Sequence, residues 1–238
     1  KATPGGTWSR SNNIIATVNS SGVVTGVNAG TARITYTLGS GCTAFATAIV
    51  TVNHIPAVTA ITGTLSVCEN ATRSLSSISA GGVWSSSVPA VGSIGVTGIV
   101  TGIIAGNTTI SYTVTNSFGC VGRSTAEVTV NPVPVVDTIT GTLSVCKDAT
   151  TTLSSVTAGG VWTSSTPAVG TVGLTGIVTG LNAGTTIISY TVTNGFGCVT
   201  RVTKVVTVNP LPVISSSSGI FTTCENVNLG LTSNIAFG

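Results

Sequence analysis

The chain has 238 residues, only 5% of them charged, and a formal net charge of +3. Soluble domains usually carry about 25% charged residues, so we expect a nearly uncharged surface rich in Ser and Thr hydroxyls. The basic residues form no cluster and no apolar run reaches the ~18 residues of a membrane helix, which excludes nucleic acid as a partner and a membrane-spanning role.

The sequence repeats with a period of 78 residues. Tryptophans and cysteines recur at this spacing, as the pairs Trp84/Trp162, Cys68/Cys146 and Cys120/Cys198. The similar linkers VTVNHIP, VTVNPVP and VTVNPLP separate the units, and their prolines favour a stiff, extended connection. A repeat of this length predicts small tandem domains. We place their boundaries after Asn53, Asn131 and Asn209, which gives domains 1–53, 54–131, 132–209 and 210–238.

Short strands separated by turn residues fill the second unit. We expect them, in chain order, at 57–62, 64–68, 73–78, 83–85, 99–103, 108–114 and 125–130. These segments are rich in Val, Ile and Thr, while Gly and Pro occupy the breaks between them. No segment shows sustained helical periodicity. The pattern predicts an all-β fold of tandem antiparallel β-sandwiches, joined into an extended rod.

The motifs of the second unit point to a known family. They are Trp84-Ser85-Ser86, Pro89-Ala90-Val91, Gly98-Ile99-Val100, Ala105-Gly106-Asn107 and Ile110-Ser111-Tyr112. The first and third units repeat most of them, and together they resemble the group 2 bacterial immunoglobulin-like domains of surface adhesins and invasin-like proteins. The linkers and the segment GCTAFATAIVTVN are similar to repeats in large surface proteins of Bacteroidota-type bacteria. The resemblance implies immunoglobulin-like sandwiches and an extracellular or bacterial cell-surface location.

Tryptophan and cysteine are the candidate site residues. We predict that Trp8, Trp84 and Trp162 anchor the domain cores, with sugar stacking as the alternative. We expect Cys68 to pair with Cys120, and Cys146 with Cys198. Each bridge would close a loop of about 52 residues, worth roughly 4 kcal/mol in a chain-entropy model. Six cysteines without CxxC clustering favour structural disulfides in an oxidising compartment over a metal or redox site.

The two outer segments complement each other. Residues 1–53 match the last two thirds of a domain and residues 210–238 match the first third, so Cys42 and Cys224 have no partner in their own units. One hypothesis is that the C-terminal segment of one subunit adds its strands to the N-terminal partial domain of the next, with an intersubunit Cys42–Cys224 disulfide. The alternatives are a single continuous repeat protein, and pairing of Cys42 with Cys224 within one chain.

These observations predict a structural role without catalysis. The single histidine, His54, and five scattered acidic residues argue against an active site, a metal site or a cofactor. We predict a structural subunit of an extracellular fibre or cell-surface stalk. Its partners would be copies of itself, joined head to tail, with side-by-side packing of fibres as a further expectation. The alternative is an adhesin or glycan-binding module of a larger surface protein, which would contact a surface glycan or a host protein.

Overall fold

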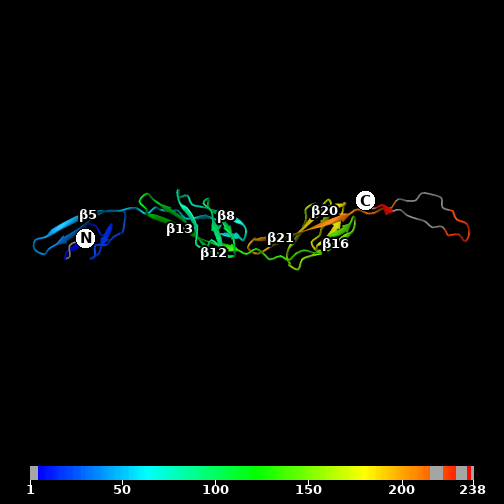
Figure 1. Cartoon of the computed structure of the whole chain (residues 1–238), viewed down its shortest axis with the longest axis horizontal. Coiled ribbons are helices and arrows are strands. Elements are labelled where there is room, and N and C mark those ends of the chain that lie inside the picture. Colours follow the sequence, from blue (N-terminus) through cyan, green and yellow to red (C-terminus); the bar gives the residue numbers. More distant parts are fainter. Residues whose placement is uncertain (1–4, 215–221, 229–234, 237–238) are drawn as a thin grey trace. The chain divides into compact units, whose positions relative to one another are not determined.

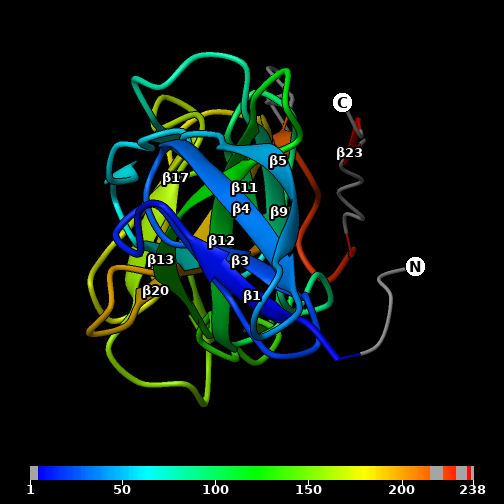
Figure 2. The ribbon, with the colours of Figure 1, turned by 90° about the vertical axis from the view of Figure 1, so that its left-hand side faces the viewer.

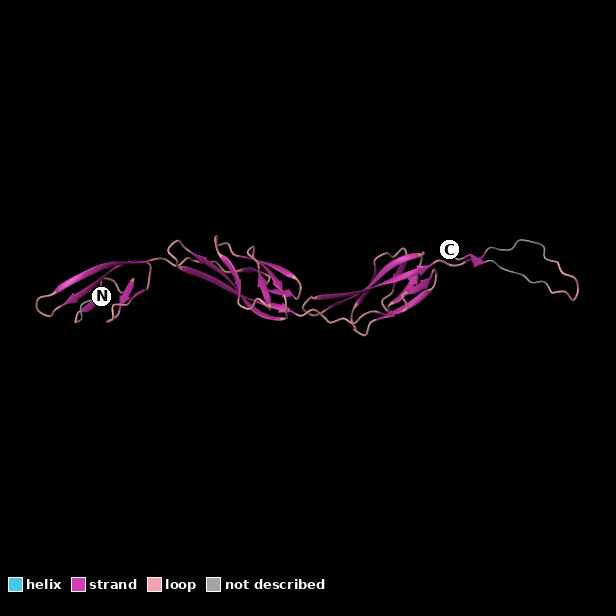
Figure 3. Cartoon of the chain, in the orientation of Figure 1, coloured by secondary structure: helices cyan, strands magenta, loops and turns pink. Residues whose placement is uncertain are grey.

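The computed structural model describes residues 5–214, 222–228 and 235–236. All regular elements among these residues are β-strands, which confirms the predicted all-β class (Figure 3). The chain divides into two compact units, Lys1–Asn131 and Pro132–Gly238. Figure 1 labels the strands in chain order.

The first unit opens with five strands, which we call the partial sandwich. They are β1 Thr7–Arg10, β2 Ala16–Val18, β3 Val24–Gly26, β4 Gly30–Leu38 and β5 Ala44–Val52. Strands β1, β4 and β5 form one antiparallel sheet in that order, while β2 and β3 form a separate two-stranded sheet (Figure 2). Few large side chains are enclosed here: the buried apolar residues are Ala16, Ala32 and Ile34.

The first unit continues with a complete sandwich of eight strands, the middle sandwich. The strands are β6 Thr62–Gly63, β7 Ser66–Cys68, β8 Thr72–Ser76, β9 Val83–Ser86, β10 Gly92–Ile94, β11 Ile99–Gly102, β12 Gly106–Thr115 and β13 Val121–Asn131. One sheet has the order β10-β11-β8-β6 and the other β7-β13-β12-β9. The core between them consists of Val67, Leu75, Val100, Ile110, Val128 and Val130.

The second unit holds the third sandwich, which repeats the middle one. Its strands are β14 Thr140–Gly141, β15 Ser144–Cys146, β16 Thr150–Ser154, β17 Val161–Ser164, β18 Gly170–Val172, β19 Ile177–Gly180, β20 Gly184–Thr193 and β21 Val199–Asn209. The sheet orders are β14-β16-β19-β18 and β15-β21-β20-β17. Beyond it, β22 Val213–Ile214 pairs antiparallel with β23 Ile235–Ala236. The tandem immunoglobulin-like sandwiches expected from the sequence are therefore present.

Two details differ from the predicted strands. Residues 57–61 form no strand, because Thr59 donates its N–H to the Ser79 hydroxyl at 3.0 Å instead of joining a ladder. Gly92, which lies in the break expected between the strands at 83–85 and 99–103, begins β10. The sandwiches are also not purely antiparallel, since β7 runs parallel to β13 and β15 parallel to β21. Two strands that pair in parallel need a long connection between them. Here the connections contain strands β8 to β12 in the middle sandwich and β16 to β20 in the third.

Each tryptophan packs against a tyrosine of the neighbouring strand, with the two rings tilted relative to each other. The ring centroids are 4.7 Å apart for Trp8 and Tyr36, and 4.6 Å for both Trp84–Tyr112 and Trp162–Tyr190. Trp84 and Trp162 are half-buried and pack against the cores of their sandwiches, whereas Tyr112 and Tyr190 are buried. The anchor is therefore an aromatic pair with the tyrosine as its inner member.

The tyrosine hydroxyl holds the turn before the tryptophan strand. In the third sandwich it donates to the Thr157 carbonyl at 2.7 Å and accepts from the Gly160 N–H at 2.8 Å. The middle sandwich repeats both bonds through Tyr112. A phenol at this position thus satisfies two backbone groups that the ring itself shields from water.

We expect Tyr190→Phe to lower the free energy of unfolding of the third sandwich by about 1–2 kcal/mol, because it leaves those two backbone groups without their partner. The measurement is denaturant unfolding followed by Trp162 fluorescence in a Trp8→Phe/Trp84→Phe background. Tyr112→Phe, which makes the same change in the middle sandwich, is the control and should leave the Trp162 transition in place. An unchanged midpoint in Tyr190→Phe would contradict this role of the hydroxyl.

Candidate assembly interface

The cysteines occur in two states. Cys68 and Cys198 are disulfide-bonded. The free thiols are Cys42, Cys120, Cys146 and Cys224. The bridges expected within each domain, Cys68–Cys120 and Cys146–Cys198, are therefore wrong.

The parallel strand register explains this correction. Cys68 lies opposite Asn131, the last residue of β13, while Cys120 comes immediately before Val121, its first residue. The 11 residues of β13 separate the two cysteines by about 35 Å at the usual strand rise. A disulfide requires Cα atoms within about 7 Å. Strand β21 separates Cys146 and Cys198 in the same way.

The remaining candidate residues form no chemical site. His54 is exposed, and its ring Nδ1 lies 2.5 Å from the Ile55 carbonyl oxygen. Within the described residues, no group of three His, Cys, Asp or Glu side chains could hold a metal ion. In the same part of the chain, no helix is long and apolar enough to cross a membrane. The features that bear on function are instead the strand edges of the partial sandwich.

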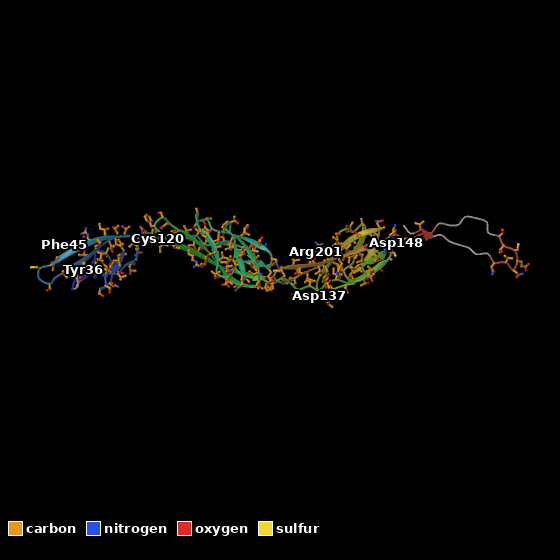
Figure 4. The ribbon with its side chains drawn as sticks, viewed as in Figure 1. Tyr36, Phe45, Cys120, Asp137, Asp148 and Arg201 are labelled. Carbon is orange, nitrogen blue, oxygen red and sulfur yellow. The ribbon has the colours of Figure 1, made fainter. Side chains whose placement is uncertain are left out.

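Strand β5 has an open edge and an uncovered face. Its counterpart β13 lies between β12 and β7, whereas β5 pairs only with β4 among the described strands. Phe45 and Ile49 on β5 are each 74% exposed (Figure 4 labels Phe45). On the opposite face Ala46 and Ala48 are also exposed, although their counterparts in β13 are half-buried. An uncovered strand of this kind is a template for pairing with another strand.

Strand β3 is open in the same way. It pairs with β2 only, within the described part of the chain, whereas its counterpart β11 has β10 on one side and β8 on the other. Val24 and Val50 of the partial sandwich are half-buried. Their counterparts Val100 and Val128 are each only 1% exposed. Covering such apolar surface is favourable by about 25 cal/mol per Å², so added strands would stabilise the partial sandwich.

In both complete sandwiches one tight turn ties the two sheets together. We call residues 68–71 and 146–149 the cysteine turns. In the middle sandwich, the Glu69 N–H donates to the carbonyl of Asn131 at the end of β13, at 2.9 Å. The Asn70 N–H donates to the carbonyl of Gly102 at the end of β11, also at 2.9 Å. The second cysteine turn makes the same two bonds to Asn209 and Gly180, each at 2.8 Å.

A third copy of the cysteine turn lies at residues 224–227. The Val227 N–H donates to the Cys224 carbonyl at 3.1 Å, as Ala71 does to Cys68. Asn226 has φ 67°, and the matching Asn70 and Asp148 have 61° and 64°. Short Asn and Asp side chains tolerate this left-handed conformation because they hydrogen-bond locally. This segment has the shape of a cysteine turn although the described residues around it form no sandwich.

A cavity of about 260 Å³ lies where the partial sandwich would receive a cysteine turn. Its lining includes Gly26, Ala29 and Val52, which match Gly102, Ala105 and Val130 by the repeat. In the middle sandwich those three surround the turn. A Cβ at Gly102 would lie 2.5 Å from the Cys68 carbonyl oxygen and 2.9 Å from a Val130 methyl carbon.

The acidic residue of the turn also has a defined contact. In the middle sandwich the Ala105 N–H donates to the Glu69 carboxylate at 2.8 Å. Glu225 occupies the Glu69 position in the third turn, and Ala29 lines the cavity at the Ala105 position. The turn at 224–227 thus repeats the backbone conformation of the other cysteine turns, and the cavity is lined by counterparts of residues that contact such a turn in the middle sandwich.

Sequence reasoning missed the cysteine turn. The signal was an Asn or Asp two residues after the cysteine, as in Cys68-Glu69-Asn70, Cys146-Lys147-Asp148 and Cys224-Glu225-Asn226. Asn and Asp are the non-glycine residues that most readily adopt positive φ. This pattern could have predicted a repeated left-handed turn.

No protein-family model matches the chain, and no curated protein matches it in sequence. Among solved structures it is similar to the surface-layer protein SbsC, domains 1–6, with 18% identity and a TM-score of 0.30, covering 88% of this chain and 36% of that one. It is also similar to Drosophila N-cadherin EC1–4, with 12% identity and a TM-score of 0.25, covering 90% and 69%. The chain thus spans about a third of the first of these. The similarities concern the fold alone, so membership of the group 2 bacterial immunoglobulin-like domains stays a prediction.

Proposed function

We propose that this protein is a structural subunit of an extracellular fibre or cell-surface stalk, assembled head to tail by strand complementation. In this assembly, the C-terminal segment of one copy, residues 210–238, adds to the open edges of β3 and β5 in the next copy. The observation that carries the proposal is the match between the preformed turn at 224–227 and the cavity of the partial sandwich.

The middle sandwich supplies the register of the added strand. There Val67 lies opposite Val130 and Cys68 opposite Asn131, in a parallel pairing. Transferred by the repeat, Thr223 would lie opposite Val52, and Cys224 opposite Asn53. Glu225 would then donate its N–H to the Asn53 carbonyl, and its carboxylate would accept from the Ala29 N–H. Adding a strand to an open sheet edge is an established mode of protein assembly.

The wider composition supports a mechanical role outside the cell. Cys68 and Cys198 are disulfide-bonded, which suits an oxidising environment. With 5% charged residues, neighbouring fibres would repel each other weakly, so side-by-side packing is favoured. The proposal involves no enzymatic step and no cofactor. The solved neighbours are, by their titles, surface-layer and cadherin proteins.

The test is the mass of the full-length chain under reducing conditions, measured by sedimentation velocity over a range of concentrations. We expect oligomers that are multiples of 23.4 kDa and grow with concentration. Asn226→Pro should abolish them, because proline fixes φ near −65° and removes the N–H that would bond to Gly26. Asn226→Gly, which accepts a positive φ, is the matched control and should assemble like the parent chain.

Two results would contradict the proposal. The first is a parent chain that stays at 23.4 kDa at every concentration. The second is an Asn226→Pro variant that assembles as well as Asn226→Gly. In either case the cysteine turn would not be the element that joins the copies.

A further inference from the structure

We infer that each joint between copies is closed by a disulfide between Cys224 of one copy and Cys120 of the next, an inference that rests on the strand complementation proposed above. It differs from the Cys42–Cys224 bridge expected from the sequence. It follows from the strand register together with the position of one sulfur atom.

The register determines where Cys224 would lie. In the middle sandwich the cysteine of the turn is opposite Asn131, at the end of the terminal strand. The matching residue of the partial sandwich is Asn53, which directly follows β5. Adjacent strands lie about 4.8 Å apart, so a donor strand in this register brings Cys224 beside Asn53.

The Cys120 thiol is already at this place. Its Sγ lies 3.9 Å from the Asn53 carbonyl oxygen, although 67 positions separate the two residues in sequence. Cys120 is half-buried and a free thiol. Cysteines form a disulfide when their Cα atoms are about 4.4–6.8 Å apart, a separation that neighbouring strands readily provide.

A hydrogen-bonded loop holds Cys120 against the linker. The Asn116 side-chain amide donates to the His54 carbonyl at 2.8 Å, and its oxygen accepts from the Cys120 N–H at 2.9 Å. In the third sandwich, Asn194 makes the same two bonds to Pro132 and Cys198, at 2.8 and 3.0 Å. In both sandwiches the loop therefore places its cysteine beside the linker that precedes the first strand.

The states of the two cysteines agree with this bond. Cys120 and Cys224 are both free thiols, so each is available to pair with the other across a joint between copies.

Cys42 is badly placed for Cys224. It precedes Ala44 at the start of β5, whereas Asn53 follows the end of that strand. The nine residues of β5 span about 30 Å, well beyond the reach of a disulfide. The argument is the same one that separates Cys68 from Cys120.

Formation of the bridge is a two-electron oxidation. The thiols of Cys224 and Cys120 lose two protons and two electrons as their S–S bond forms. A disulfide oxidant, such as oxidised glutathione or a disulfide-exchange protein outside the cytoplasm, accepts them and leaves as two thiols. The product is a covalent joint that dilution cannot separate.

The experiment uses full-length chains with single reactive cysteines, all of which keep Cys68 and Cys198. A donor retains Cys224 and carries Cys42→Ser, Cys120→Ser and Cys146→Ser. One isotope-labelled acceptor retains only Cys120 of the four, and a second retains only Cys42. Donor and acceptor are mixed in a glutathione redox buffer, and the disulfide-linked tryptic peptides are identified by mass spectrometry. Cys224 and Cys120 lie alone in peptides 205–238 and 74–123, which makes their link unambiguous.

We expect the Cys120 acceptor to cross-link to the donor at least about tenfold more than the Cys42 acceptor, because only the former comes within disulfide range. Cross-linking to Cys42 in preference would overturn the inference. So would association of donor and acceptor, seen by sedimentation, without a link to either cysteine; strand complementation would then stand alone. The absence of any association would instead contradict the proposed function itself.

Discussion

Replacing Ile188 by alanine lowers the free energy of unfolding of the third sandwich by about 2–5 kcal/mol, the usual cost of truncating a buried isoleucine. Ile188 lies on β20, is 0% exposed, and belongs to the core with Leu153, Val178 and Val206. The truncation removes apolar contacts and leaves a cavity. Strand β20 is paired with a strand on each side, so it cannot easily move to close that cavity. For a small domain, a loss of this size is a large part of its total stability.

Its neighbour Ile187 is the matched control. It is the same residue on the same strand, but it faces the other way and is 43% exposed. Ile187→Ala is expected to cost less than about 1 kcal/mol, the span of strand propensity. Trp162 packs against the same core, so its fluorescence in the Trp8→Phe/Trp84→Phe background reports the transition. Equal losses for the two variants would mean that β20 is not oriented as described.

Gly176→Ala is expected to lower the free energy of unfolding of the third sandwich by about 2–4 kcal/mol, through backbone strain and overpacking. Gly176 has φ +83°, and a Cβ there would lie 2.2 Å from the Leu153 carbonyl oxygen. The neighbouring backbone cannot yield, because the Leu153 N–H donates to the Gly176 carbonyl at 2.9 Å. The turn and β16 would have to separate to admit the methyl group.

Gly159→Ala isolates the backbone-strain part of this effect. Gly159 also has a positive φ, +80°, but a Cβ there would meet nothing within 4 Å. It should cost only the about 1–2 kcal/mol of left-handed strain. The two variants are compared by Trp162 fluorescence during denaturant unfolding. If Gly159→Ala proved as damaging as Gly176→Ala, the contact with Leu153 would not be the cause.

Much of the fold could be predicted because its signals are local. The alternation of Val, Ile and Thr predicted strands that correspond to β8, β9, β11, β12 and β13. The strand predicted at residues 57–61 was wrong because the Thr59 backbone N–H bonds to a side chain, which the alternation of residues does not reveal. The prediction that residues 1–53 match the last two thirds of a domain used only the repeat and stays a prediction.

The candidate interface was less accessible to sequence reasoning. The repeat aligned Cys224 with Cys68, but the cavity at Gly26 and Val52 depends on two sheet ends meeting in space. Equal spacing in sequence also suggested pairing within each domain. It could not show that β7 joins β13 in parallel, which carries Cys68 to the opposite end of the strand from Cys120.

The sequence by itself determined the all-β class and the repeated unit, because the first depends on residues close together and the second on a fixed period. Only the tertiary structure decided which cysteines lie too far apart to pair and which strand edges are open among the described residues. Those outcomes depend on strand direction and register, which are selected by packing between segments 60 or more positions apart, such as β7 and β13. Parallel and antiparallel pairing use the same alternating residues, so no local pattern distinguishes them.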